Sequence, residues 1–69
     1  MTKSIMITLN GAPHQIEKGE TSQSLLNRFK QNPDHIMIEH NATIYKGTQW
    51  ECSIQDGDTI EIIQFMGGG

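Results

Sequence analysis

Alternating hydrophobic positions mark both ends of this chain as β-strands. Near the start, Ile5, Ile7 and Leu9 stand two residues apart, which is the spacing of side chains on one face of a strand. Near the end, residues 59–65 are rich in isoleucine, which favours strands. We therefore predict a first strand over residues 3–9 and a last strand over residues 59–65.

The dipeptide Asn10-Gly11 follows the first strand directly. A two-residue type I′ turn needs a positive φ at both central positions, which asparagine and glycine accept more readily than other residues. The chain should therefore turn back here into a second strand over residues 12–17. Pro13 cannot donate a hydrogen bond to a sheet, so this strand belongs at an edge.

A short amphipathic helix is predicted over residues 22–31. Thr21 or Ser22 can cap its start by accepting hydrogen bonds from free backbone amides. Pro33 ends it, because the residue before a proline is pushed out of the helical region. Three hydrophobic residues share one face of this helix and should cover a sheet, namely Leu25, Leu26 and Phe29.

The middle of the chain carries two further short strands. Ile36, Ile38 and His40 alternate on one face of the first, with His40 expected to be partly buried. Residues 41–43 form a tight turn into the second strand, which contains residues 44–45.

The segment between these strands and the last strand is irregular. Residues 46–49 are interpreted as a loop, with Trp50 and Ile54 as a satellite of the core beneath it. The Asp-Gly-Asp sequence at residues 56–58 predicts a turn, with its glycine in the left-handed conformation.

The last strand has a face that the helix does not cover. Strand alternation directs Ile63 and Phe65 to that opposite face. Apolar side chains exposed there, extended by Met66, would form a docking face for a partner protein. The alternative is that they pack across the sheet against Met6 or Tyr45.

The predicted order of elements is β-β-α-β-β-β. One helix of this size covers one face of one sheet, so the fold is an α+β sandwich of two layers. A hairpin, a crossing helix and a closing strand beside the first strand describe a β-grasp (ubiquitin-like) arrangement, one mixed sheet of four to five strands packed on a single helix. Residues 1–66 should form this domain, and residues 67–69 a flexible glycine tail.

Composition favours a small protein that acts through other proteins. A chain of 69 residues has no room for a deep cleft lined by several catalytic groups, so we do not expect an enzyme. Five Lys and Arg against eight Asp and Glu give a formal charge of -3, which disfavours nucleic-acid binding. No hydrophobic run is long enough to span a membrane, and a single cysteine fits a reducing compartment. We expect a cytoplasmic protein that is monomeric when free.

Other reactive residues form weaker patterns. Cys52 is either an inert residue, a persulfide relay or a point of covalent linkage to a partner. His14, His35 and His40 lack the spacing of a metal site, and the two aspartates of residues 56–58 lack the other ligands of a calcium loop. We predict no metal site and no bound cofactor.

Several features follow one another along essentially the whole chain. They are Asn10-Gly11, the short helix with its paired leucines, Ile36-Met37-Ile38-Glu39-His40-Asn41, Gln49-Trp50, Ile54-Gln55-Asp56-Gly57-Asp58 and a final Gly-Gly pair. Their order resembles the sulfur carrier proteins of thiamine biosynthesis. The chain departs from that family at residues 45–47, at His40, where an apolar residue is usual, and at Ala42, which replaces a turn glycine.

The resemblance implies a carrier that other proteins act upon. An ATP-dependent activating enzyme would adenylate the carboxylate of Gly69 and convert it to a thiocarboxylate, which donates sulfur to thiazole synthase. Gly67 and Gly68, which lack Cβ atoms, would let the tail thread into a partner's active site. ATP would be used by the activating enzyme and not bound here.

Two other interpretations stay open. The chain could carry sulfur in another pathway, as the small subunit of molybdopterin synthase or as a carrier for tRNA thiolation. It could instead be a β-grasp interaction module, or a ubiquitin-like modifier, whose tail forms isopeptide bonds or has no role.

Overall fold

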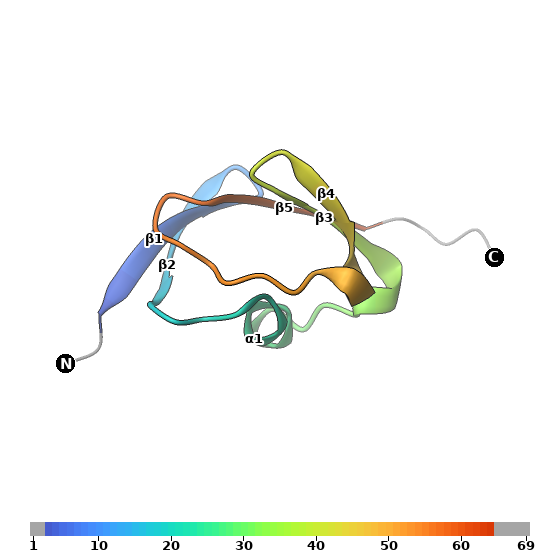
Figure 1. The fold of residues 1–69 in the computed structure, drawn as a ribbon, viewed down its shortest axis with the longest axis horizontal. Coiled ribbons are helices and arrows are strands. Elements are labelled where there is room, and N and C mark those ends of the chain that lie inside the picture. Colours follow the sequence, from blue (N-terminus) through green and yellow to red (C-terminus); the bar gives the residue numbers. More distant parts are fainter. Residues whose placement is uncertain (1–2, 65–69) are drawn as a thin grey trace.

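A computed structural model of the protein describes residues 3–64. In this part of the chain five strands form one sheet, and one α-helix packs on one of its faces (Figure 1). The strands are β1 (Ser4–Leu9), β2 (Ala12–Glu17), β3 (Ile36–His40), β4 (Thr43–Lys46) and β5 (Thr59–Gln64), the helix is α1 (Ser22–Arg28), and two 3₁₀ helices are η1 (Pro33–His35) and η2 (Gly47–Gln49). The predicted two-layer β-grasp fold is confirmed.

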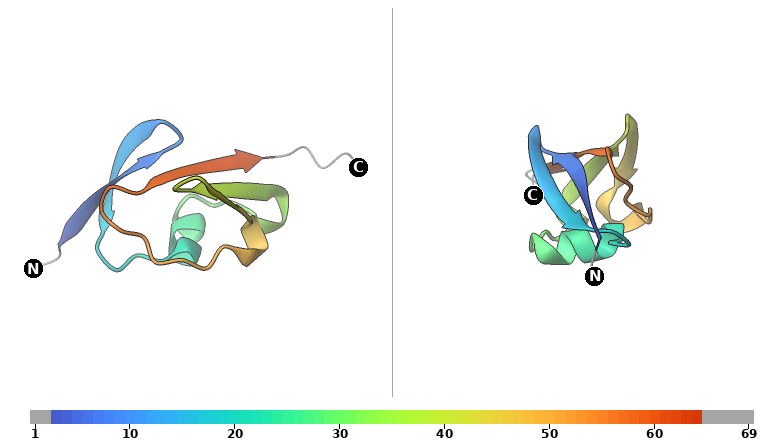
Figure 2. Two further views of the ribbon diagram at one scale, coloured as in Figure 1. Left: turned by 45° about the horizontal axis from the view of Figure 1, so that its top comes forward. Right: turned by 90° about the vertical axis from the view of Figure 1, so that its left-hand side faces the viewer.

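The sheet is mixed, with β5 at its centre. Its strand order is β2-β1-β5-β3-β4, in which only the β1–β5 pair is parallel (Figure 2). The first and last strands of the chain therefore lie side by side, as the β-grasp prediction requires. β2 lies at one edge, which is where Pro13 can avoid the need to donate a ladder hydrogen bond.

Two-residue turns close both hairpins. Asn10 and Gly11 have φ values of 51° and 82°, which confirms the predicted type of turn between β1 and β2. The turn between β3 and β4 uses Asn41 and Ala42, with φ values of 50° and 74°. Ala42 therefore adopts a left-handed conformation that an L-residue with a Cβ atom enters only at a cost.

The helix is shorter than predicted. Its start agrees with the prediction, because Thr21 is the N-cap and exchanges hydrogen bonds with Ser24 in a capping box. Its end does not agree, because the helix stops at Arg28 and Lys30 then adopts a φ of 55°. The helix therefore ends before it reaches Pro33, the residue that we expected to end it.

Backbone hydrogen bonds explain this early end. The amide of Lys30 donates to the carbonyl of Asn27 at 3.1 Å, and the amide of Gln31 donates to the carbonyl of Leu26 at 3.0 Å. This pair of bonds is a Schellman motif, which satisfies the last carbonyls of a helix once one residue turns left-handed. Lys30 fills the position that glycine usually occupies, so the sequence carried no signal for it.

The core lies between the sheet and α1, and it is larger than predicted. Trp50 and Ile54 are 1% and 5% exposed and belong to the main cluster, so their assignment to a satellite was wrong. The segment 46–49, predicted as a loop, contains η2, which brings Gly47 against η1. The other buried hydrophobic residues are Ile7, Leu9, Ile16, Leu25, Leu26, Ile36, Ile38 and Ile60.

Candidate functional site

β5 is the element that leads to the predicted reactive tail. Phe65, Met66 and the glycines Gly67, Gly68 and Gly69 lie outside the described residues, as does the predicted domain boundary between 66 and 67. What the structure describes is the strand that precedes them and the surface around its end.

The end of β5 is fixed by neighbours on both sides. β3 pairs with it as far as Ile36, which lies opposite Gln64. On the other side the amide of Ile62 donates to the side-chain oxygen of Asn10 at 2.8 Å, which continues the contact beyond the last residue of β1. The side chain of Gln64 donates to that of Gln31 at 3.0 Å. The segment beyond residue 64 is therefore attached to a well-anchored strand.

The predicted outward direction of Ile63 is confirmed. Ile60 is fully buried against the core, whereas Ile63 is 45% exposed on the opposite face of the sheet. Its cross-strand neighbour is Met37, so it does not pack against Tyr45, which pairs with Ile38 on β3 and packs against the core. A role for Ile63 in docking stays a prediction.

Sequence reasoning missed Ile44 on this outer face, and it named Met6 there only as a residue against which Ile63 could pack. Ile44 is 60% exposed and lies opposite Glu39, and Met6 is 48% exposed on β1. The signal was present, since Ile44 precedes the core-facing Tyr45 and must therefore point the other way. The outer face of the sheet thus carries more apolar surface than Ile63 alone.

A buried polar network lies beneath the turn that opens β5. The indole N–H of Trp50 donates to Nδ1 of His40 at 3.1 Å, and Nε2 of His40 lies 2.7 Å from Oδ2 of Asp58. Because Nδ1 accepts, Nε2 carries the ring proton and donates to the carboxylate. The side chain of Asn41 and the amide of Gln55 donate to the same carboxylate, both at 2.9 Å.

These hydrogen bonds favour the ionised form of the Asp58 carboxyl group. Burial opposes ionisation and by itself would raise the pKa, but hydrogen bonds from Asn41, the Gln55 amide and His40 outweigh it. The pKa of Asp58 is consequently held below its ordinary value. The network therefore holds a carboxylate that joins the end of β3 to the start of β5, and it gives the buried His40 a hydrogen-bond partner on each ring nitrogen.

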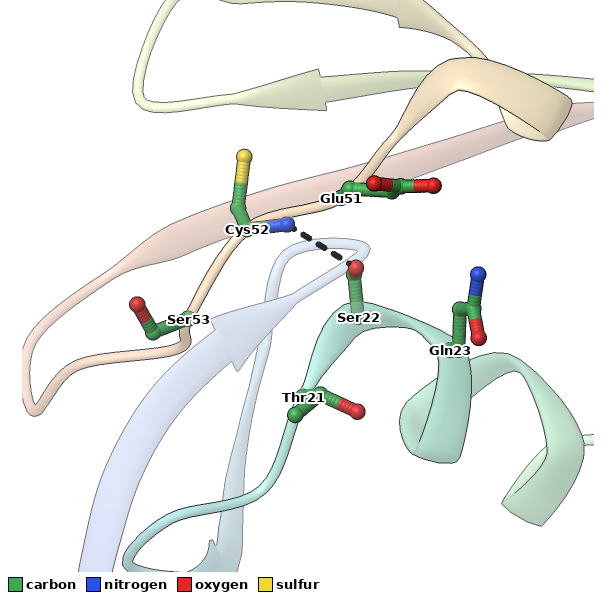
Figure 3. Close-up of a pocket in the computed structure, with 6 residues that line it drawn as sticks. All are labelled: Thr21, Ser22, Gln23, Glu51, Cys52 and Ser53. Carbon is green, nitrogen blue, oxygen red and sulfur yellow. Dashed lines mark hydrogen bonds between the residues drawn. The ribbon is translucent and has the colours of Figure 1, made fainter.

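Cys52 lines a shallow hollow between the start of α1 and residues 51–53, with a volume of about 490 Å³ (Figure 3). The hydroxyl of Ser22 donates to the carbonyl of Trp50 at 2.8 Å and accepts from the amide of Cys52 at 3.0 Å. Ser22 therefore ties the helix to this segment. The Cys52 sulfur points away from the Ser22 hydroxyl in Figure 3.

Cys52 raises the pKa of the neighbouring Tyr45 side chain. A hydrogen bond with Cys52, together with the charge of that group, raises the pKa of the Tyr45 hydroxyl above its ordinary value. This contact gives Cys52 a structural neighbour, and the persulfide role considered from the sequence remains untested.

Residues 3–64 contain no group of three or more His, Cys, Asp and Glu side chains placed to hold a metal ion. The histidines are used separately, with His14 edge-on to the ring of Phe29 and His40 in the buried network. The one α-helix of the described chain is too short to cross a membrane.

Together, the sheet order, the parallel pairing of β1 with β5 and the single covering helix define a β-grasp protein. A sequence profile of the ThiS family matches residues 7–69, and the chain belongs to that family. The resemblance drawn from the sequence is thereby confirmed.

Similar proteins agree with this assignment. A crystal structure of the thiamine biosynthesis protein ThiS from Geobacter metallireducens is 26% identical, covers 94% of this chain and 100% of its own, and superimposes with a TM-score of 0.76. A thiazole synthase from Magnetococcus marinus is 39% identical over 91% of this chain, and the chain spans only 20% of that protein's length. An uncharacterized protein, ycf40, from Porphyra purpurea is 36% identical over 100% of this chain and 99% of its own length.

Proposed function

We propose that the protein is a sulfur carrier for thiazole formation in thiamine biosynthesis. The observation that carries the proposal is the match to the ThiS family over residues 7–69, a range that includes all three glycines of the tail. The thiazole synthase relative adds support, because one fifth of that protein resembles nearly the whole of this chain. A segment similar to this chain thus belongs to a polypeptide that is named a thiazole synthase.

The proposed chemistry takes place on the carboxyl group of Gly69. A carboxylate resists nucleophiles because it is negatively charged and has a poor leaving group. An ATP-dependent adenylating enzyme would let this carboxylate attack the α-phosphorus of ATP, so that pyrophosphate leaves. A sulfide nucleophile would then attack the acyl carbon, and AMP would leave with the electrons of the broken C–O bond. The product is a thiocarboxylate that can donate its sulfur to thiazole synthase.

The role of this chain in the proposed reaction is to present the carboxyl group of Gly69 to the active sites of other enzymes. Residues 66–69 reach on the order of 13 Å when extended at roughly 3.3 Å per residue, so Gly69 can enter a buried site while the folded body stays outside. Gly67 and Gly68 add no Cβ atoms that would obstruct a narrow entrance. Ile63, Phe65 and Met66 are proposed to contact the partner at that entrance, and ATP is proposed to bind the adenylating enzyme only. We propose that the carrier is cytoplasmic and monomeric when free.

Intact-mass analysis tests the proposal. The chain is incubated with ATP, sulfide and an adenylating enzyme isolated by ATP–pyrophosphate exchange that depends on the wild-type chain. The expected result is the mass increase for replacement of one oxygen by sulfur, located at Gly69 by fragmentation. A variant lacking both Gly68 and Gly69, which no longer ends in a Gly-Gly pair, is the matched control and should not react. An unchanged wild-type mass, or a sulfur located elsewhere, would contradict the proposal.

Complementation separates the pathways. A strain that lacks its own thiazole carrier should grow without added thiazole when it expresses the wild-type chain, and it should not grow with the chain lacking Gly68 and Gly69. Rescue of a molybdopterin-deficient or tRNA-thiolation-deficient strain in place of the thiazole strain would assign the carrier to another pathway. Attachment of Gly69 to lysines of other proteins would make the chain a modifier instead.

A further inference from the structure

Two glutamates face each other on the outer surface of the sheet. Glu39 on β3 and Glu61 on β5 are directly opposite in the antiparallel register. Directly opposed residues have Cβ atoms about 5 Å apart, and like charges at such positions destabilise a sheet. Lys46 lies one row away, opposite Met37, yet neither glutamate takes part in an ion pair within residues 3–64.

Apolar residues border this acidic pair. Ile44 lies opposite Glu39 on the β4 side, and in the adjacent row Met37 lies opposite Ile63. Ile44 and Ile63 are 60% and 45% exposed, whereas Met37 is partly buried. The two carboxylates therefore lie beside exposed apolar side chains on the same face of the sheet.

The surface is hollowed at the acidic pair. A shallow cavity of about 360 Å³ is lined by Glu39, Glu61, Thr59 and the turn residues Asn41 and Ala42. A long side chain with a cationic end matches this shape and charge, because its stem can pack on apolar atoms while its end meets two carboxylates. The same strand, β5, continues toward the tail.

From this arrangement we propose that Glu39 and Glu61 bind a basic side chain, arginine or lysine, on the thiazole synthase that receives the sulfur, while Met37, Ile44 and Ile63 pack against apolar residues around it. The choice of thiazole synthase over the adenylating enzyme rests on the proposed function and on the thiazole synthase from Magnetococcus marinus, one fifth of which resembles this chain. The chemistry required of the partner, a cation within an apolar surface, follows from the register, the exposure and the hollow.

Calorimetric titration with the thiazole synthase of the same organism tests the proposal. Glu39→Gln with Glu61→Gln should weaken the Kd by at least about tenfold, the effect of losing a hydrogen bond to a charged group, and should flatten its salt dependence. Glu17→Gln is the matched control, since it removes the same charge from β2 at the far end of the same face. It should bind like the wild-type chain.

A stability measurement separates a binding role from a structural one. Relief of the opposed charges should raise the melting temperature of the double variant by about 2–4 °C, so weaker binding would not reflect unfolding. A double variant that binds as tightly as wild type overturns the proposal, as does a wild-type chain that self-associates through this face. Failure of the proposed function is distinct, because it would appear as a wild-type chain that forms no thiocarboxylate in the mass assay.

Discussion

Replacing Asp58 by asparagine tests the buried network. The carboxylate accepts from three donors, with His40 and the Gln55 amide on Oδ2 and Asn41 on Oδ1. An asparagine that keeps its oxygen toward His40 turns its NH₂ group toward the NH₂ of Asn41. Asn41 cannot rotate to relieve this contact without loss, because its own oxygen accepts from the amide of Thr59 at 2.9 Å.

The expected loss follows from these contacts. One hydrogen bond to a charged group disappears and the remaining bonds lose their charge assistance, so Asp58→Asn should lower the free energy of unfolding by about 2–4 kcal/mol. For a domain of this size that corresponds to a fall in melting temperature of about 10–25 °C. Thermal and urea unfolding followed by circular dichroism at pH 7 would measure both.

The pH dependence gives an independent check. A carboxyl group whose pKa is lowered on folding stabilises the protein above its unfolded pKa, and this contribution is lost as the pH falls through the folded pKa. The stability difference between wild type and Asp58→Asn should therefore be full at neutral pH and shrink below about pH 4.

Asp56→Asn provides the matched control for this prediction. Asp56 lies in the same turn, and its Oδ1 accepts a single hydrogen bond, from the amide of Met6 at 2.8 Å, which an asparagine oxygen can also accept. It should retain near-wild-type stability. If Asp58→Asn were as stable as this control at pH 7, the network would not hold β3 and β5 together as argued.

Three further predictions concern backbone and side-chain contacts. Gly47→Ala should destabilise the fold by about 1–3 kcal/mol in urea unfolding, because its Cβ would lie 2.6 Å from Cγ1 of Ile36, and an unchanged midpoint would contradict this. Ala42→Gly should stabilise by about 1 kcal/mol, since the left-handed φ of 74° favours glycine, and a lower melting temperature would contradict it. Cys52→Ala should lower the pKa of Tyr45 toward its ordinary value, measured by ultraviolet titration of the chain's single tyrosine, and an unshifted curve would show that the thiol is not the cause.

The sheet and its turns were predictable because their signals are local. Asn10-Gly11 fixes a turn type through its own φ preferences, and Pro13 excludes a central strand through its missing N–H. The helix end was not predictable in this way. Lys30 turns left-handed despite its Cβ, and no residue type in the sequence marks that position.

The features of the candidate site differ in the same way, since some follow from local sequence and others depend on the tertiary structure. The outward direction of Ile63 follows from strand alternation, which needs no knowledge of its neighbours. The network of Trp50, His40 and Asp58 joins residues up to 18 positions apart, so it depends on how the segment before β5 folds under the sheet. The opposition of two glutamates across β3 and β5 depends on the register between those strands, which only the assembled sheet determines.

The parallel pairing of β1 with β5 has a mechanical consequence. A pull on the chain beyond Gln64, opposed at the start of β1, would draw these neighbouring strands in opposite directions along their length. The backbone bonds from Thr8 to Asp58 and from Asn10 to Ile60, both 2.9 Å, would then carry the load together and not one after another. Such a pull therefore loads β5 in shear against β1 and does not peel the two strands apart one hydrogen bond at a time.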